Sequence, residues 1–450
     1  MANTEDEGIQ ISVDMQWVAS LEKKVSDTKF SDRGTKPTIF RVPDILKKID
    51  PQAYEPLLVS LGPYHHDKLH LQAMNQLKWK CLKFVLEKNN RMGLKDYVDL
   101  IKKLETQARD AYSEEVKMDS NSFVEMMLLD GCFLMLTIMK WTDMVISEEI
   151  TWMESVSSLA PHVLRDIYML ENQLPFFLLE TLYESLFPTN LPSFRELTFG
   201  FIRMHVSTIL KLSTDKIEPY HHIIHLLLSC IDPTTNHGID NGNQSSTFGF
   251  LCNSKLVKTV YVDDSPWIPS ATACKEAGIH FVRKRKGKSF LDITFQNGKL
   301  EIPQLRIDDN TDSLLRNLIA YEQCSTGSRF NVTSYMVFMD SLINTAADVE
   351  LLQQHEIIFN DLEDTQQIAT LFNKLGANVI YNSNDFYLKD VFNAMTKHRN
   401  TRCNKWRARC NHDYFSNPWA IISLFGALAL FVLTATQAAF AILRYFLPPN

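Results

Sequence analysis

The strongest constraint on this chain is an uncharged stretch close to its C-terminus. No charged residue stands between Asp413 and Arg444, and the middle of this interval is the apolar run from Trp419 to Leu443. A helix of 25 residues that rises about 1.5 Å per residue is roughly 37 Å long, which exceeds the hydrocarbon core of about 30 Å. The run therefore predicts a transmembrane helix over 418–443 and a short tail over 444–450. A buried core helix is the alternative, although such helices are rarely this long and uncharged.

The residues before the predicted span indicate its start and its orientation. Asn417 is a typical helix cap, and Pro418 fits the first helical position. Basic residues gather upstream of the span, whereas Arg444 alone follows it; the upstream residues are Lys397, Arg399, Arg402, Lys405, Arg407 and Arg409. By the positive-inside rule the N-terminal part is cytosolic. The start, MANTEDEGIQ, is acidic and lacks the apolar core of a signal peptide. The sequence thus predicts a single-pass, tail-anchored protein whose basic residues contact an anionic leaflet.

Composition fits a globular protein with a sizeable core. Hydrophobic residues make up 45% and charged residues 22% of the chain, and the formal net charge is −7. This balance shows no polyanion-binding character, so nucleic acid is not an expected partner. The eight cysteines contain no CxxC pair, and most lie in apolar runs, which is typical of reduced thiols in the cytosol.

Hydrophobic periodicity divides the chain into predicted regions. Residues 1–37 are polar and partly disordered, and 38–231 form a helical lobe with apolar residues at three-and-four spacing. A Gly-, Asn- and Ser-rich loop or seam follows over 232–268. A second helical lobe covers 269–412, with helical patterns at 314–324, 334–343, 348–352, 366–375 and 386–395.

One β signal interrupts this helical pattern near 280–307. The β-branched and aromatic runs 290–295 and 300–307 are joined by Asn297-Gly298, a pair that fits a type I′ turn. Upstream, the run FVRKRKGKSF is a candidate third strand. The predicted fold class is therefore mainly α, with a small antiparallel hairpin or meander and one C-terminal transmembrane helix.

Buried polar residues are the places where a catalytic site would have to lie. Asp130 sits inside an apolar run, and Asp166 and Glu171 are five residues apart in LRDIYMLENQLP. A buried carboxylate needs a partner such as Arg41, Arg165, His225 or a backbone amide. One hypothesis is a general acid and base pair; the other is that these groups satisfy backbone freed near Pro175 and lock the packing of helices. We assign no catalytic, cofactor or metal residue.

Two histidine pairs have the four-residue spacing that zinc binding on one helix face requires. They are His221 with His225 and His66 with His70. Neither pair carries the glutamate of an HExxH motif, and the Gly-Pro turn before His65 removes the helical premise for the second pair. The chain also lacks a phosphate loop, a GxGxxG turn and a GxSxG elbow. We expect no metal and no cofactor.

Small and polar residues follow one face of the predicted span. The stripe follows four-and-three spacing and consists of Ser423, Ala427, Leu430, Thr434, Gln437 and Ala441. Its mostly small or hydrogen-bonding members Ser423, Ala427, Thr434 and Gln437 suit pairing with another transmembrane helix, including a second copy of the chain. The alternative is that such residues are common in spans and the stripe is incidental.

Several strings together carry a family resemblance. They are IFRVPDIL, AYEPLLVSLGPYHH, MMLLDGCFLM, LRDIYMLENQLPFFLLETLY, SFLDITFQNGKLEIPQL, NLIAYEQC and DYFSNPWAIIS. In this order, from about residue 38 to 440, the chain resembles the plant family catalogued as domain of unknown function 247. The resemblance implies a largely helical plant membrane protein with one C-terminal span and no established enzyme activity. One departure is Ala273-Cys274, where family members usually carry Glu-Leu.

These observations predict a plant membrane protein whose large cytosolic domain is an interaction or recognition module. Its partners would be the lipid bilayer and a protein that the sequence does not identify. The alternative function is a membrane-attached enzyme that uses Asp130, Asp166, Glu171 and His225. Which membrane holds the protein is not resolved by the sequence.

Overall fold

The fold is mainly α-helical, as the sequence predicts, and it is described here from a computed structural model. The structure describes residues 15–27, 37–144, 147–154, 158–187, 192–206, 212, 220–231, 268–326, 329–362, 364–377, 379, 386–401 and 418–446. The predicted seam over 232–268 lies outside the described residues except for Ile268.

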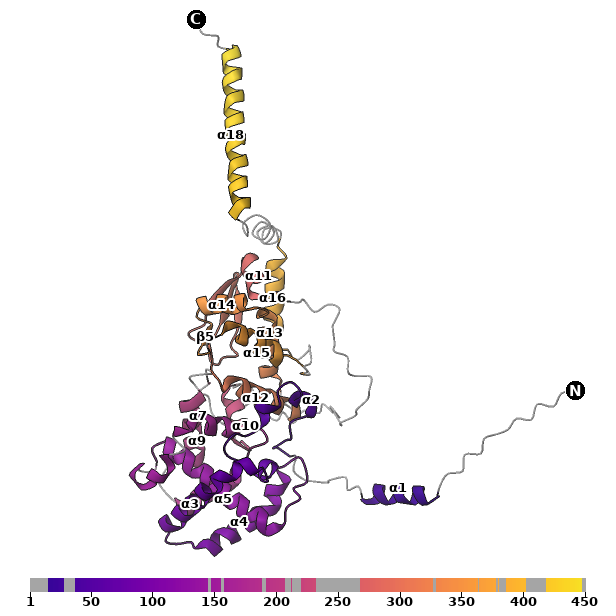
Figure 1. The fold of residues 1–450 in the computed structure, drawn as a ribbon, viewed down its shortest axis with the longest axis vertical. Helices are drawn as coiled ribbons and strands as arrows, with labels where there is room; N and C mark the ends of the chain where they lie inside the picture. Colours follow the sequence, from indigo (N-terminus) through magenta and orange to yellow (C-terminus); the bar gives the residue numbers. More distant parts are fainter. Residues whose placement is uncertain are drawn as a thin grey trace, which may run out of the picture.

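The first lobe is a set of helices gathered around α5 (Figure 1). Its elements are α2 (Asp44–Lys47), η1 (Pro51–Tyr54), η2 (Pro63–His65), η3 (Leu69–Met74), α3 (Asn75–Lys88), α4 (Leu94–Asp110), α5 (Ser120–Trp141), η4 (Ser147–Met153), α7 (Ala160–Ile167), α8 (Phe176–Leu186), α9 (Phe194–Val206) and α10 (Ile223–Ile231), where η marks a 3₁₀ helix.

Helix α5 is the centre of this lobe because it is apolar on nearly every face. Its N-terminus is capped by Asp119, whose side chain accepts the N–H groups of Asn121 and Ser122. Gly131 lets α8 approach closely, since a Cβ atom there would lie 2.5 Å from Leu182 Cδ1. Packing against α3, α4, α8 and α9 then buries α5 from Phe123 onward.

The second lobe combines short strands with helices. Its elements are α11 (Ala271–Glu276), β1 (His280–Arg283), β2 (Thr294–Gln296), β3 (Lys299–Ile302), β4 (Leu305–Ile307), α12 (Thr311–Cys324), α13 (Asn331–Leu342), α14 (Ala346–Gln354), β5 (Ile358–Asn360), α15 (Thr365–Leu375) and α16 (Lys389–Arg399). Each of the five helical patterns expected between 314 and 395 coincides with a helix from α12 to α16, although 334–343 extends one residue past α13 and 386–395 begins three residues before α16.

The predicted hairpin is confirmed, and two strand pairings differ from a simple meander. β2 and β3 pair antiparallel around Asn297 and Gly298, whose φ values are 51° and 77°, as a type I′ turn requires. β1 joins β3 in parallel, with His280 opposite Lys299. The expected strand 300–307 is divided at Pro303, which has no N–H to donate to a ladder. Its second part, β4, pairs in parallel with β5.

Helix α12 lies between the two lobes (Figure 1) and is buried along almost its whole length. Ser313 Oγ donates to Ala53 O at 2.7 Å, and Asn317 Nδ2 donates to the same carbonyl at 3.0 Å. Asn317 Oδ1 accepts the N–H of Leu170 at 2.9 Å. One continuous hydrophobic core therefore runs through both lobes.

Two helices stand clear of the lobes in Figure 1. Helix α1 (Met15–Asp27) exposes Trp17, Leu21 and Val25 at four-residue spacing. Helix α18 (Pro418–Phe446) contains the expected span and begins at Pro418; Asn417, expected to cap it, lies outside the described residues. Within its most apolar window, Phe425–Ile442, no part is buried by protein.

A polar clamp in the first lobe and an apolar terminal helix

Asp166, at the end of α7, binds three consecutive backbone amides of an extended segment, residues 57–62. Its Oδ1 accepts the N–H of Leu57 at 2.9 Å, and its Oδ2 accepts those of Leu58 and Val59 at 2.7 and 3.0 Å. The carboxyl is completely buried. Burial raises the pKa of Asp166, although the three N–H donors oppose this shift. Asp166 thus holds the segment by its main chain.

Asn172 and Gln173 extend this arrangement, which we call the polar clamp: the side chains of residues 166–173 that bind backbone groups. Asn172 Oδ1 accepts the N–H of Leu61 at 2.7 Å, and its Nδ2 donates to Val59 O at 3.0 Å. Gln173 Nε2 donates to Ile167 O at 2.7 Å. Segment 57–62 belongs to no sheet, so its backbone groups have no neighbouring strand to bond. The side chains of the polar clamp form hydrogen bonds with these backbone groups instead.

Asp130 holds the far end of the same segment from α5. Its Oδ2 accepts the N–H of Gly62 at 2.9 Å, and its Oδ1 lies 2.5 Å from Lys78 Nζ. Lys78 also donates to Ser60 O at 2.6 Å. Both charged side chains are 2% exposed. Each charge therefore has an opposite charge and a backbone partner, which a buried ion pair needs to offset its desolvation.

Glu171 binds the chain just after its entry into the first lobe. Its Oε1 accepts the N–H of Val42 at 2.7 Å and lies 2.6 Å from Lys47 Nζ. Its Oε2 lies 3.3 Å from Arg41 Nη1 and 3.4 Å from His65 Nε2. Burial alone would raise the pKa of Glu171, but its contacts with His65, Lys47 and the Val42 amide outweigh burial and lower it to about 2.

His225 belongs to a different cluster, at the start of α10. Its Nδ1 accepts the N–H of His221 at 3.2 Å, and its own N–H donates to His222 Nδ1 at 3.3 Å. His222 Nε2 lies 2.9 Å from Thr38 O, which assigns the ring proton to Nε2. Burial, followed by the charge of His221, lowers the pKa of His225 to about 4. The ring is neutral at pH 7 and caps the helix start.

The four residues of the predicted polar cluster thus hold main chain at three places. Asp166 and Asp130 bind amides at the two ends of segment 57–62, Glu171 binds the Val42 amide, and His225 bonds within its own turn. Each carboxylate also has a basic partner, which for Asp166 is Arg165, with Nη1 and Oδ1 3.6 Å apart. Sequence reasoning anticipated amide partners, but it did not find Lys78. The sequence does contain a hint that Lys78 is buried: Lys78 lies on the apolar face of α3, where Leu77, Cys81 and Val85 are also buried.

The described residues contain no group of three or more His, Cys, Asp or Glu side chains arranged to hold a metal ion. His66 follows η2, and His70 lies in η3, where its Nε2 is 3.1 Å from Pro56 O. The rings of His221 and His225 stack with their centroids 5.1 Å apart.

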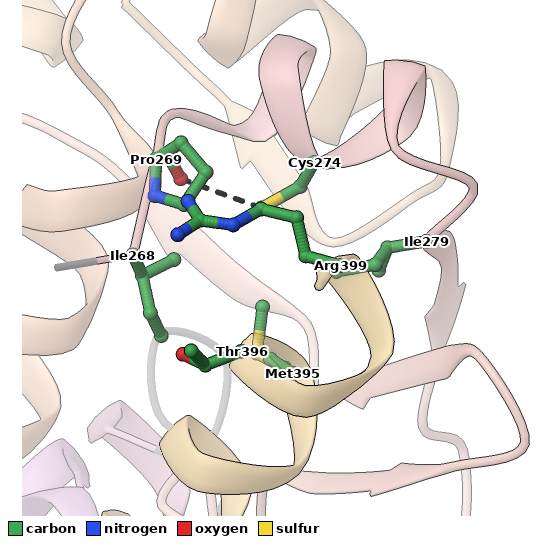
Figure 2. Close-up of a pocket in the computed structure, with 7 residues that line it drawn as sticks. All are labelled: Ile268, Pro269, Cys274, Ile279, Met395, Thr396 and Arg399. Carbon is green, nitrogen blue, oxygen red and sulfur yellow. Dashed lines mark hydrogen bonds between the residues drawn. The ribbon is translucent and has the colours of Figure 1, made fainter. Parts of the chain in front are cut away.

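A small cavity lies in the second lobe, between α11 and α16 (Figure 2). Its volume is about 10 Å³, which is close to what one water molecule needs. The lining residues are Ile268, Pro269, Cys274, Ile279, Met395, Thr396 and Arg399. Cys274 Sγ donates to Pro269 O at 3.4 Å, and burial raises the pKa of this thiol to about 12 despite the nearby Arg399. Cys274 is therefore a core thiol.

Among the residues that the structure describes, two helices have the length and composition of a membrane span. In α5 the most apolar window is 89% buried inside the first lobe, whereas that of α18 is not buried at all. The backbone of α18 includes Trp419 and Leu443, and its exposed surface includes Ser423, Ala427, Thr434 and Gln437. Arg399 ends α16, while Arg402, Lys405, Arg407 and Arg409 lie outside the described residues.

Fold and contacts together define the class: a mainly helical protein whose lobe is held by a polar clamp and which carries an exposed apolar helix long enough to span a membrane. The chain belongs to the plant family of unknown function catalogued as domain of unknown function 247, whose family model matches residues 39–433.

Curated relatives cover nearly the whole chain. A UPF0481 protein of Arabidopsis thaliana is 31% identical over 418 residues, which cover 90% of this chain and 86% of the relative. A putative UPF0481 protein of the same plant is 22% identical over 515 residues, which cover 96% of both chains. No solved structure gives a significant match.

Proposed function

We propose that α18 anchors the protein in a membrane and that the two lobes form a cytosolic interaction or recognition module. The observation that carries the anchor is the exposed apolar surface of α18, which includes Phe425, Leu428, Phe431 and Phe440 at 60% exposure or more. Each such side chain is worth roughly 1.5–3 kcal/mol when it is removed from water. A bilayer would cover this surface on all sides, and α18 satisfies its own backbone groups as a span must.

The orientation rests on charge. Lys397 and Arg399 end α16, more basic residues follow before Pro418, and Arg444 is the one charged residue within α18. Basic residues concentrate on the cytosolic side of spans. This asymmetry of charge supports the proposed cytosolic position of the lobes. The choice among membranes follows from no feature of these residues.

The role as an interaction module rests on how the polar residues are used. The carboxylates that could have formed an acid and base pair each bind main-chain amides, so their geometry serves to hold the lobe. The exposed surface of the lobes is then the part available to bind a partner. A protein held at a membrane meets partners of that membrane at a raised effective concentration.

Pairing of α18 with another transmembrane helix, including a second copy, is part of this proposal. Thr434 Oγ1 donates to Leu430 O at 2.7 Å, so its hydroxyl is satisfied inside the helix. No hydrogen bond of the Gln437 carboxamide is found among the described residues. In a bilayer this carboxamide would gain a partner across a helix pair.

Proximity labelling in plant cells tests the proposal. The full chain is compared with a chain that ends at Asn417, both carrying the labelling enzyme at the N-terminus. We expect membrane proteins to dominate the neighbours of the full chain, and these neighbours to disappear on truncation. Identical neighbour sets would contradict the anchor. A matched control, Leu428→Ile and Leu433→Ile in the full chain, keeps the span apolar and should keep its neighbours.

A further inference from the structure

Cationic side chains from three separate segments gather at one end of the second lobe. Lys275 lies in the last turn of α11, Lys299 begins β3, and Lys397 and Arg399 lie in the last turn of α16. The three lysines are exposed and Arg399 is partly exposed. We call these four residues the basic end. Lys275 and Arg399, the first and last of them, are 124 residues apart in the sequence, so the fold brings the three segments together.

Backbone and ring contacts join β3 to α16. The N–H of His280 donates to Gly298 O at 2.8 Å, which sets the hairpin turn beside β1. A Cβ atom on Gly298 would lie 2.9 Å from His398 Cε1, and the rings of Phe295 and His398 are 5.7 Å apart. Lys299 follows Gly298, so its backbone lies beside this contact with α16.

The third segment, α11, meets α16 at the small cavity of Figure 2. In that view the Arg399 side chain passes Cys274 and its guanidinium lies beside Pro269, and Lys275 follows Cys274 in α11. The charge of Lys275 also acts on His355, whose pKa is lowered first by burial and then by Lys275 and His280. Lys275 therefore belongs to the same end of the lobe.

This end carries an excess of positive charge. Within the described residues, none of its four cations forms an ion pair, whereas Lys284 elsewhere in the sheet pairs with Asp292 at 2.7 Å. The carboxylates on α11, β3 and α16 are Glu276, Glu301 and Asp390. Nearby Glu356 lies 3.1 Å from Arg283. With Lys389 at the start of α16, these three elements carry five cations against three carboxylates.

The basic end is also where the chain leaves the lobe for the apolar helix. Helix α16 ends at Arg399 and α18 begins at Pro418. In Figure 1, α11 and α16 lie at the end of the lobe nearest α18. If α18 spans a bilayer, this end is the part of the described lobe with the shortest tether to the lipid surface.

From the charge and the tether we infer that the basic end rests against the membrane surface and binds anionic phospholipid headgroups, such as phosphatidylserine. The inference rests on the proposed anchoring by α18, and it goes further because it fixes which face of the lobe is covered. Each basic residue near such a surface contributes an attraction that salt screens. The first lobe then points away from the membrane and is the part left open to partners.

Amine footprinting of the full chain tests the inference. The protein is reconstituted into vesicles of phosphatidylcholine alone or with 30% phosphatidylserine as the probe lipid, floated, labelled with an amine-reactive reagent and read by mass spectrometry. We expect Lys275, Lys299 and Lys397 to be labelled several-fold more slowly with phosphatidylserine, and this protection to disappear in high salt. Lys102 and Lys103, exposed on α4 in the first lobe, should label equally in both vesicles.

Paired variants separate the basic end from general charge effects. Lys275→Glu with Lys299→Glu should abolish the several-fold protection of Lys397, because each reversal replaces an attraction to the anionic surface with a repulsion. The matched control, Lys102→Glu with Lys103→Glu, makes the same charge change on α4 and should leave it intact. If the floated protein labels equally in both vesicles, this inference is overturned and the anchor stands. If the protein does not float with either vesicle, the anchor itself is overturned.

Discussion

Lys78 on α3 and Asp130 on α5 form an ion pair in the core of the first lobe, with Nζ and Oδ1 2.5 Å apart. Lys78→Met would leave the Asp130 charge buried without its partner. We expect a loss of about 3–5 kcal/mol in unfolding free energy. Urea unfolding of the detergent-solubilised protein measures it.

The same pair allows a double-mutant cycle as a control. Lys78→Met with Asp130→Leu removes both charges, so the double variant should lose less than the sum of the two single variants. Additive losses would show that the two side chains do not stabilise each other.

Because of Glu171, the free energy of unfolding should depend on pH in the acidic range. Its folded pKa of about 2 lies below its ordinary value of 4.5, so its contribution is present above about pH 4.5 and is lost as the pH falls toward 2. The full contribution is on the order of 3 kcal/mol. Glu171→Gln should therefore melt well below the wild type at pH 6, and the gap in Tm should narrow by pH 3. A constant gap across this range would rule out the ionised carboxylate as its source.

Gly62 should not tolerate a side chain. Its φ is +73°, and a Cβ atom would lie 2.7 Å from Tyr112 Oη and 2.9 Å from Gln173 O, two atoms that are themselves hydrogen-bonded at 3.0 Å. Gly62→Ala combines a strained backbone with a clash, so we expect a loss of about 2–4 kcal/mol. Gly93→Ala is the matched control, because the nearest atom there is 3.8 Å away. Thermal melts that rank the two variants in the opposite order would contradict the clash.

Glycosylation mapping should report a cytosolic lobe. The sequon at Asn331 is uninformative because Asn331 and Thr333 are buried at the start of α13. Asn243, outside the described residues, is the useful reporter. We expect it to carry no glycan, and a long sequon-bearing tag added after Asn450 to be glycosylated. A gel shift with endoglycosidase H checks both, and loss of a shift in Asn243→Gln would reveal the opposite orientation.

Gln437 should matter if α18 pairs with another helix. Gln437→Leu removes the carboxamide and Ala427→Leu fills the small-residue face, so each should weaken self-association in bilayers by about 1 kcal/mol. Energy transfer between labelled copies in vesicles measures it. Leu428→Ile, off this face, is the control. Unchanged transfer in both test variants would end the pairing idea.

Local sequence signals predicted the hairpin because the Asn297-Gly298 turn is chosen by its own two residues. They did not predict the parallel pairs of β1 with β3 and of β4 with β5. The strands in each of these pairs are not consecutive in the sequence, so no local signal indicates that they meet. The division of the strand at Pro303 shows the same limit. Its missing N–H marks a break, but it does not say which sheet receives the next strand.

The polar clamp was predictable in part. Asp130, Asp166 and Glu171 stand out because carboxylates are rare in apolar runs. Their partners do not stand out, because the amides of Leu57, Leu58 and Val59 are chemically the same as any other amide in the chain. Sequence could therefore indicate which side chains need partners but could not locate those partners.

Helix α12 has a consequence for how the protein can be divided. Asn317 bonds to Ala53 and Leu170 of the first lobe while α12 also packs against α13 and α15 of the second. A fragment that stops before residue 311 would lack α12 and so leave part of the core of the first lobe exposed. A fragment that starts at residue 311 would expose to water the face of α12 that the first lobe covers. The two lobes should therefore unfold in a single transition, and a destabilising substitution in either lobe should lower the stability of both.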